Sequence, residues 1–85
     1  MDKSFVLKIV TPTEVFFEGR AESVVAPGGL GYLGILKSHA PFISTVSKGN
    51  LTFRNPDGKS QSYQVEGGFL EVLNNRVLVL TDKIE

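Results

Sequence analysis

Apolar and polar residues alternate along most of the chain, the pattern of β-strands that bury one face. In residues 4–10, for example, Phe5, Leu7 and Ile9 fall on the same face. Further short runs of this kind occupy residues 14–17, 20–26, 32–36, 42–46, 51–55, 60–65, 69–73 and 76–81. No window shows a sustained helical period with capping residues. The sequence therefore predicts an all-β fold.

Turn-forming residues separate these runs about every 8–12 positions, a spacing typical of a small sandwich or barrel. Pro56-Asp57-Gly58 predicts a hairpin, and Asn74-Asn75 predicts a two-residue primed turn, because Asn tolerates positive φ. Glu18-Gly19 is predicted to end the strand at 14–17. No linker or repeat divides the chain, so we expect residues 1–85 to form one small β-sandwich domain of about 8–10 short strands.

Several predicted strands carry apolar residues on both faces, which is more than one core requires. These residues are Val6 and Val10 opposite Phe5, Leu7 and Ile9; the adjacent pairs Phe16-Phe17 and Val24-Val25; and Leu70 and Val72 opposite Phe69 and Leu73. Some of these side chains must point away from the core. An outward apolar patch on a small domain often binds a protein partner. The alternative is that a short edge strand or a loop covers them.

Composition narrows the classes of function. Nine Lys and Arg residues balance nine Asp and Glu residues without clustering, which gives no support for binding nucleic acid or an anionic membrane. The absence of cysteine excludes disulfides and thiolate zinc sites, and suits a cytosolic protein. No apolar run approaches the roughly 20 residues of a transmembrane helix. A chain of 85 residues also has a small core with little room for a deep pocket.

The segment at residues 29–34 formally matches the dinucleotide-binding pattern G-x-G-x-x-G. That motif requires a following helix, whose N-terminus holds the pyrophosphate. Here Pro41 stops any helix almost at once, and the expected acidic residue is missing from residues 49–52. We therefore interpret these glycines as turn residues and expect no nucleotide at this loop.

His39 is the single histidine and is a candidate general base or metal ligand. A metal site would need further histidine or cysteine ligands, and no serine lies in a nucleophile-elbow context. Glu66 and Glu71 give no evidence of an acid–base pair. We expect a loop histidine that bonds the backbone or contacts a partner, with no catalytic residue, metal or cofactor.

Four segments, in order, resemble one known family. They are LKIVTPTEVFFEG near the start, GYLGILKSHAPFIS with its G-x-L-G-I-x-x-x-H-A-P pattern, GGFLEV at 67–72 and NRVLVLTD at 75–82. The chain is similar over essentially its whole length to the epsilon subunit of rotary F-type ATP synthases, called delta in mitochondria. The resemblance implies a flattened β-sandwich, followed in the family by a C-terminal helical hairpin.

The resemblance also implies a function. Family members are non-catalytic rotor subunits of the central stalk that link the gamma subunit to the membrane c-ring. We expect the same partners here, and a peripheral location on the cytoplasmic face of a bacterial inner membrane or an equivalent energy-transducing membrane. The chain ends at Lys83-Ile84-Glu85, where the hairpin would begin. We therefore expect either a naturally short form, which we favour, or a truncated family member. Without the hairpin, we expect the chain neither to inhibit hydrolysis by insertion nor to bind ATP.

The family motifs assign two candidate binding segments. Leu30, Gly31, Tyr32 and Leu33 match the loop that faces the c-ring, and His39, Ala40, Pro41 and Phe42 match the turn beside gamma. Two departures from the common pattern occur: Tyr32 replaces a frequent glutamate, and Lys37-Ser38 replaces a frequent Pro-Gly pair. The first departure predicts a stacking or apolar contact with the ring in place of a charged one.

Three other functions remain as alternatives. The first is a stand-alone β-sandwich module that binds peptide or carbohydrate, which would need an exposed aromatic platform. An enzyme would need His39 and a carboxylate to converge in a pocket. A barrel that binds single-stranded nucleic acid is the least supported, because the basic residues do not cluster.

Overall fold

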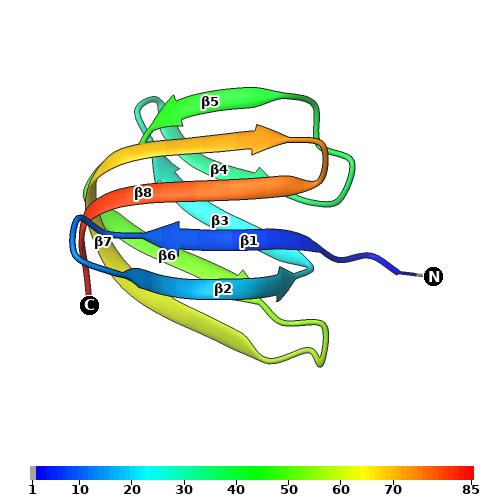
Figure 1. Ribbon diagram of the computed structural model, residues 1–85. Helices are drawn as coiled ribbons and strands as arrows, with labels where there is room; N and C mark the ends of the chain where they lie inside the picture. The colour runs from blue at the N-terminus through cyan, green and yellow to red at the C-terminus, as the bar shows by residue number, and fades with distance from the viewer. Residues whose placement is uncertain (1) are drawn as a thin grey trace.

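A computed structural model describes residues 2–85, which contain eight strands and no helix. The strands are β1 (Phe5–Val10), β2 (Val15–Ala21), β3 (Ser23–Gly28), β4 (Gly31–Ile35), β5 (Phe42–Thr45), β6 (Gly49–Arg54), β7 (Ser60–Leu73) and β8 (Arg76–Ile84). They form one sheet in the order β2-β1-β8-β7-β6-β3-β4, with β5 paired to β7 outside this path. The sheet folds over into two layers (Figure 1). The predicted all-β sandwich is confirmed.

Strand β7 belongs to both layers. Its first half pairs with β6, and its second half pairs with β5, while β8 follows β7 on both sides of the bend. The sequence predicts two separate strands here, at 60–65 and 69–73, and that prediction is wrong. Gly67 and Gly68 both have positive φ, 78° and 108°, so the backbone bends without leaving the sheet.

Strand β2 also extends further than the sequence predicts. Gly19 does not end the strand but pairs with Leu7 of β1, and β2 continues to Ala21. The ring of Phe17 covers the position where Gly19 lacks a side chain. An aromatic neighbour of this kind shields the glycine backbone from water, which explains how the strand passes through a residue that normally weakens it.

A β-bulge at Phe16 places two adjacent aromatic rings on the core side. The pairing of β2 with β1 shifts by one residue there, so Phe16 and Phe17 both pack against the core. The ring of Phe16 meets Tyr63 edge-on at 5.0 Å, and the ring of Phe17 lies 4.6 Å from that of Phe53. Phe16 and Phe17 are therefore not among the apolar side chains that point away from the core.

The core lies between the layers and follows the predicted alternation. Phe5, Leu7 and Ile9 of β1 are buried, as are Val77 and Val79 of β8. Each fully buried side chain of this size contributes about 1.5–3 kcal/mol. Because alternate residues of a strand point to opposite faces, burial of these residues turns their neighbours outward.

Both predicted hairpin turns are confirmed. At the β6–β7 connection, the Gly58 amide donates to the Asn55 carbonyl at 2.9 Å. At the β7–β8 connection, Asn74 and Asn75 have φ values of 50° and 58°, as a primed turn requires. The second turn fixes the register of the two strands that carry most of the outer surface described below.

We expect Gly68→Ala to destabilise the protein by about 2–4 kcal/mol, because the site combines a left-handed backbone with no room for a side chain. A Cβ there would lie 1.7 Å from the Leu80 carbonyl oxygen. Gly34→Ala is the matched control, since a Cβ at Gly34 meets nothing within 4 Å. Urea unfolding should show a change within about 1 kcal/mol for that variant. Equal urea midpoints for Gly68→Ala and Gly34→Ala would contradict the requirement for glycine at the bend of β7.

Candidate partner-binding surfaces

The outer face of the layer formed by β5, the second half of β7, β8 and β1 is rich in exposed apolar side chains. Its exposed apolar members are Ile43, Phe69, Leu73 and Leu80, together with the half-buried Val6, Val10 and Leu78. Ile43 and Phe69 are 67% and 54% exposed. Solitary exposed apolar residues are ordinary, but a contiguous group on one face is typical of a binding surface.

The strand register makes these residues contiguous. Phe69 of β7 lies opposite Leu80 of β8, which in turn lies opposite Val10 of β1. In the neighbouring row, Glu71 lies between Ile43 and Leu78. Directly opposed side chains in a sheet are in contact distance, so the first row is a continuous apolar strip across three strands.

A shallow groove of about 290 Å³ runs through this face. It is lined by Ile43, Phe69, Glu71, Leu78 and Leu80. Lys8 and Glu18 lie beyond it in a second hollow that also reaches Glu71 and Arg76. An apolar centre bordered by charged residues is the usual anatomy of a protein–protein interface.

The outer face of the other layer is different. On β6 and the first half of β7, Thr52 and Ser62 bond through their hydroxyl groups at 2.7 Å. Val25 and Tyr32 are its exposed large apolar or aromatic residues on β3 and β4. The apolar surface of the described residues is thus concentrated on one side of the sandwich.

The glycine-rich segment forms the β3–β4 hairpin and continues into β4, with no helix after it. Gly28 pairs with Gly31, which leaves Gly29 and Leu30 at the tip. Leu30 is fully exposed, and Gly31 has a φ of 129°. The interpretation as turn residues is confirmed for Gly29 and Gly31, whereas Gly34 lies within β4 opposite Val25.

Tyr32 projects from the same hairpin but is held in place. Its hydroxyl oxygen accepts a hydrogen bond from the Asn50 amide at 3.1 Å. A Cβ at Gly49 would clash with this hydroxyl and with Pro27, so the absence of a side chain at Gly49 makes room for the phenol. Tyr32 is therefore part of the local structure as well as of the surface.

The connection at residues 36–41 carries His39 and leads directly into β5. The ring Nδ1 of His39 donates a hydrogen bond to the Ala40 carbonyl at 2.7 Å, since a carbonyl can only accept. The ring meets that of Phe42 edge-on at 5.9 Å. The predicted bond from His39 to the backbone is confirmed. Phe42 lies opposite the buried Val72 and Ile43 lies opposite Glu71, so the two side chains point to opposite faces of β5, and the loop joins the apolar outer face at Ile43.

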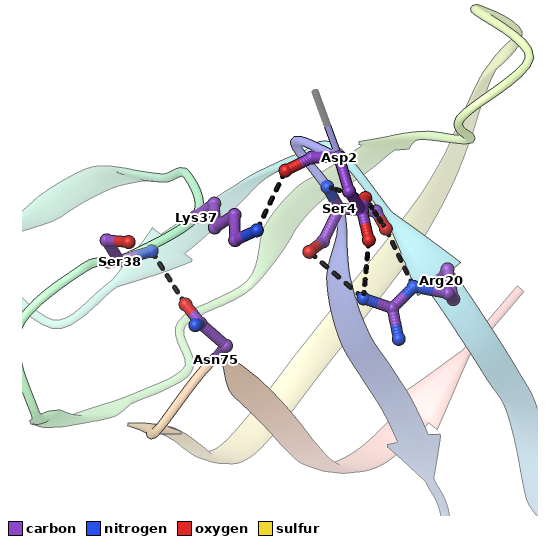
Figure 2. Close-up of polar contacts among 6 residues, drawn as sticks. All are labelled: Asp2, Ser4, Arg20, Lys37, Ser38 and Asn75. Atoms are coloured by element: carbon purple, nitrogen blue, oxygen red, sulfur yellow. Dashed lines mark hydrogen bonds and ion pairs between the residues drawn. The ribbon is translucent and has the colours of Figure 1, made fainter.

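A polar cluster lies at the edge of this loop (Figure 2). The Asp2 carboxylate accepts hydrogen bonds from the amide and the hydroxyl of Ser4, at 2.8 and 2.6 Å. It also lies 3.6 Å from the guanidinium of Arg20. The hydrogen bonds from Ser4, followed by the positive charges of Arg20 and Lys37, hold the pKa of Asp2 below its ordinary value.

Residues 2–85 contain no group of three or more His, Cys, Asp or Glu side chains able to hold a metal ion. The same residues include no helix that is long and apolar enough to cross a membrane.

The structure brings together residues that the sequence treats separately, namely Phe69 and Val10. It adds Ile43, Leu78 and Leu80, which sequence analysis did not identify. The signal for Leu78 and Leu80 was the unbroken apolar run at 77–80, too long for a strand with one buried face.

Residues 4–85 match the profile of the family described as ATP synthase, Delta/Epsilon chain, beta-sandwich domain. The chain belongs to this family. It is 42% identical over 83 residues to an ATP synthase epsilon chain of Chlorobium limicola, a match that covers 98% of this chain and 94% of the relative. It is 45% identical over its full length to the epsilon chain of Desulforamulus reducens, of which it covers 64%.

Solved structures agree with the fold of this delta/epsilon-family domain. A chain in the Euglena gracilis mitochondrial ATP synthase, solved as OSCP/F1/c-ring, superposes with a TM-score of 0.92 at 20% identity. A chain in the central stalk/c-ring of the Tetrahymena thermophila enzyme superposes with a TM-score of 0.78 at 17% identity. The present chain spans 54% and 64% of these two chains.

We expect Asp2→Asn to lower stability at neutral pH and to have little effect in acid. Because the folded state lowers the pKa of Asp2, the stabilisation is present above the ordinary value of 3.8 and is lost as pH falls through the lowered pKa. Thermal unfolding of wild type and variant from pH 7 downwards measures this difference. Asp82→Asn, at an exposed position on β8, controls for the loss of one charge. If the difference in unfolding temperature between wild type and Asp2→Asn stayed constant with pH, the expectation would be contradicted.

Proposed function

We propose that the chain is a non-catalytic central-stalk subunit of a proton-translocating F-type ATP synthase, joining the gamma subunit to the c-ring. In this role it turns with the rotor, so that proton flow through the ring is coupled to ATP synthesis at sites on other subunits. Membership of the epsilon chain family supports the proposal. The observation that carries it is the apolar outer face on β5, β7, β8 and β1.

This face is the proposed contact with gamma. Phe69, Leu80 and Ile43 offer large apolar side chains at its centre, the kind of residue that dominates binding energy once it is desolvated. The candidate residues His39, Ala40, Pro41 and Phe42 immediately precede Ile43 in the chain. The loop therefore leads into β5 at the edge of the apolar face, where Ile43 points outward, and this proximity supports placing gamma across both.

The β3–β4 hairpin is the proposed contact with the c-ring. The candidates Leu30, Gly31, Tyr32 and Leu33 form its tip and its return strand. Because Tyr32 is anchored to Asn50, the freely exposed apolar side chain at the tip is that of Leu30. Binding through this hairpin would hold the domain at the membrane surface, on the side that faces the catalytic sector.

The alternative of a peptide- or carbohydrate-binding module has less support. Such a site needs several aromatic rings on one platform. Tyr32 and Phe69 are both exposed, but they lie on opposite layers of the sandwich.

The first experiment is a titration of the purified chain with the gamma subunit of its own complex, followed by calorimetry and sedimentation. The proposal expects a one-to-one complex, because one apolar face is available for binding. Absence of binding at tens of micromolar would overturn the proposed contact.

Leu80→Asp should weaken gamma binding at least about thirtyfold, since it places a charge in the centre of the apolar strip. Val25→Asp is the matched control: both positions are 43% exposed, but Val25 lies on the outer face of the opposite layer. Calorimetry should find the control within about threefold of wild type. Equal losses in the two variants would place gamma elsewhere.

Leu30→Asp should reduce attachment of the gamma complex to the c-ring while leaving gamma binding unchanged, because the side chain at the hairpin tip makes no internal contact that folding requires. Cosedimentation with purified c-ring measures the first effect, and calorimetry with gamma measures the second. Val25→Asp again controls for the added charge. Full ring attachment by Leu30→Asp would exclude the hairpin tip as the ring contact.

A further inference from the structure

We propose that Asn75 is a positioning residue for the loop at residues 36–41, and that its side chain presets this loop for binding gamma. The inference rests on the proposed contact of residues 39–42 with gamma. Asn75 itself lies in the β7–β8 turn and has no assigned role in either candidate segment.

The loop needs an external support. Leu36, Lys37 and Ser38 are all exposed, and the one backbone bond inside the loop runs from the His39 amide to the Leu36 carbonyl at 3.2 Å. Ser38 has a φ of 68°, a left-handed conformation that is unfavourable for a serine. A conformation of this kind persists only where neighbouring groups hold it.

Asn75 provides that support. Its side-chain Oδ1 accepts a hydrogen bond from the Ser38 amide at 2.7 Å (Figure 2). Its own backbone is fixed, because its carbonyl accepts a bond from the Val6 amide of β1 at 3.1 Å. The side chain therefore presents an acceptor at a constant position relative to the outer layer.

A second bond acts on the adjacent residue. The Lys37 ammonium donates to the Asp2 carbonyl at 2.8 Å, and Asp2 is itself held by Ser4 and Arg20. This bond uses a flexible lysine side chain, whereas the bond from Ser38 joins a rigid backbone amide to a turn residue. We therefore assign the larger effect on loop position to Asn75.

The bond between Ser38 and Asn75 affects the positions of His39 and Phe42. Both residues follow Ser38 within four positions, and β5, which begins at Phe42 and ends at Thr45, pairs with β7 alone among the described strands. If the bond at Ser38 is lost, the loop samples more conformations, and gamma must order it on binding. That ordering lowers affinity without removing any contact residue.

The test compares three variants. Asn75→Gly removes the acceptor and keeps the positive φ, which glycine adopts freely. Asn74→Gly makes the same change at the other turn residue, whose φ is 50°, and controls for glycine flexibility. Asn75→Asp retains an oxygen acceptor and should rescue the effect. Hydrogen exchange at the Ser38 amide and calorimetry with gamma are the two measurements.

We expect Asn75→Gly to speed exchange at Ser38 and to weaken gamma binding by about three- to tenfold, the effect of one ordinary hydrogen bond. Asn74→Gly and Asn75→Asp should remain near wild type in both measurements. Equal exchange in the two glycine variants, or unchanged gamma affinity despite faster exchange, would overturn the inference. If wild type itself fails to bind gamma, the proposed function fails, and exchange alone then decides whether Asn75 holds the loop.

Discussion

The bend of β7 at Gly67 and Gly68 is the constraint on which the rest of the fold depends. One strand of 14 residues pairs with β6 in one layer and with β5 in the other, while β8 accompanies it through the bend. The core between the layers exists because the sheet closes over itself at this point. A side chain at Gly68 would meet the carbonyl of Leu80, so the close approach of β7 and β8 depends on the missing Cβ.

The same strand pair produces the proposed interface. In β8, Val77 and Val79 are buried in the core, which leaves Leu78 and Leu80 on the outer face. A soluble domain acting alone would gain nothing from apolar residues there, since burial against the second layer already satisfies the core. Their alignment with Phe69 and Val10 leaves an apolar strip on the outer face, which is typical of a surface that binds a protein partner.

Polar contacts determine the conformation of one loop, whereas the apolar core stabilises the sandwich as a whole. The core determines that the layers close, but it does not reach the loop between β4 and β5. There, individual hydrogen bonds to Asn75 and Asp2 set the conformation. Each contributes little to global stability, because the groups are exposed and water competes for them. Their effect is local: they determine where His39 and Phe42 lie relative to the apolar face.

The sequence by itself determined the strand pattern, both hairpin turns, the core face of β1 and the family, because alternation, turn chemistry and ordered motifs are local properties. It did not determine that Phe16 and Phe17 share one side, that β2 passes through Gly19 or that β7 is continuous. Each of these features depends on pairing and packing with a neighbouring strand. Nor did the sequence bring Ile43, Phe69 and Leu80 together, or Ser38 to Asn75. Those contacts join residues distant in the chain, and only strand register and the closing of the sheet decide them.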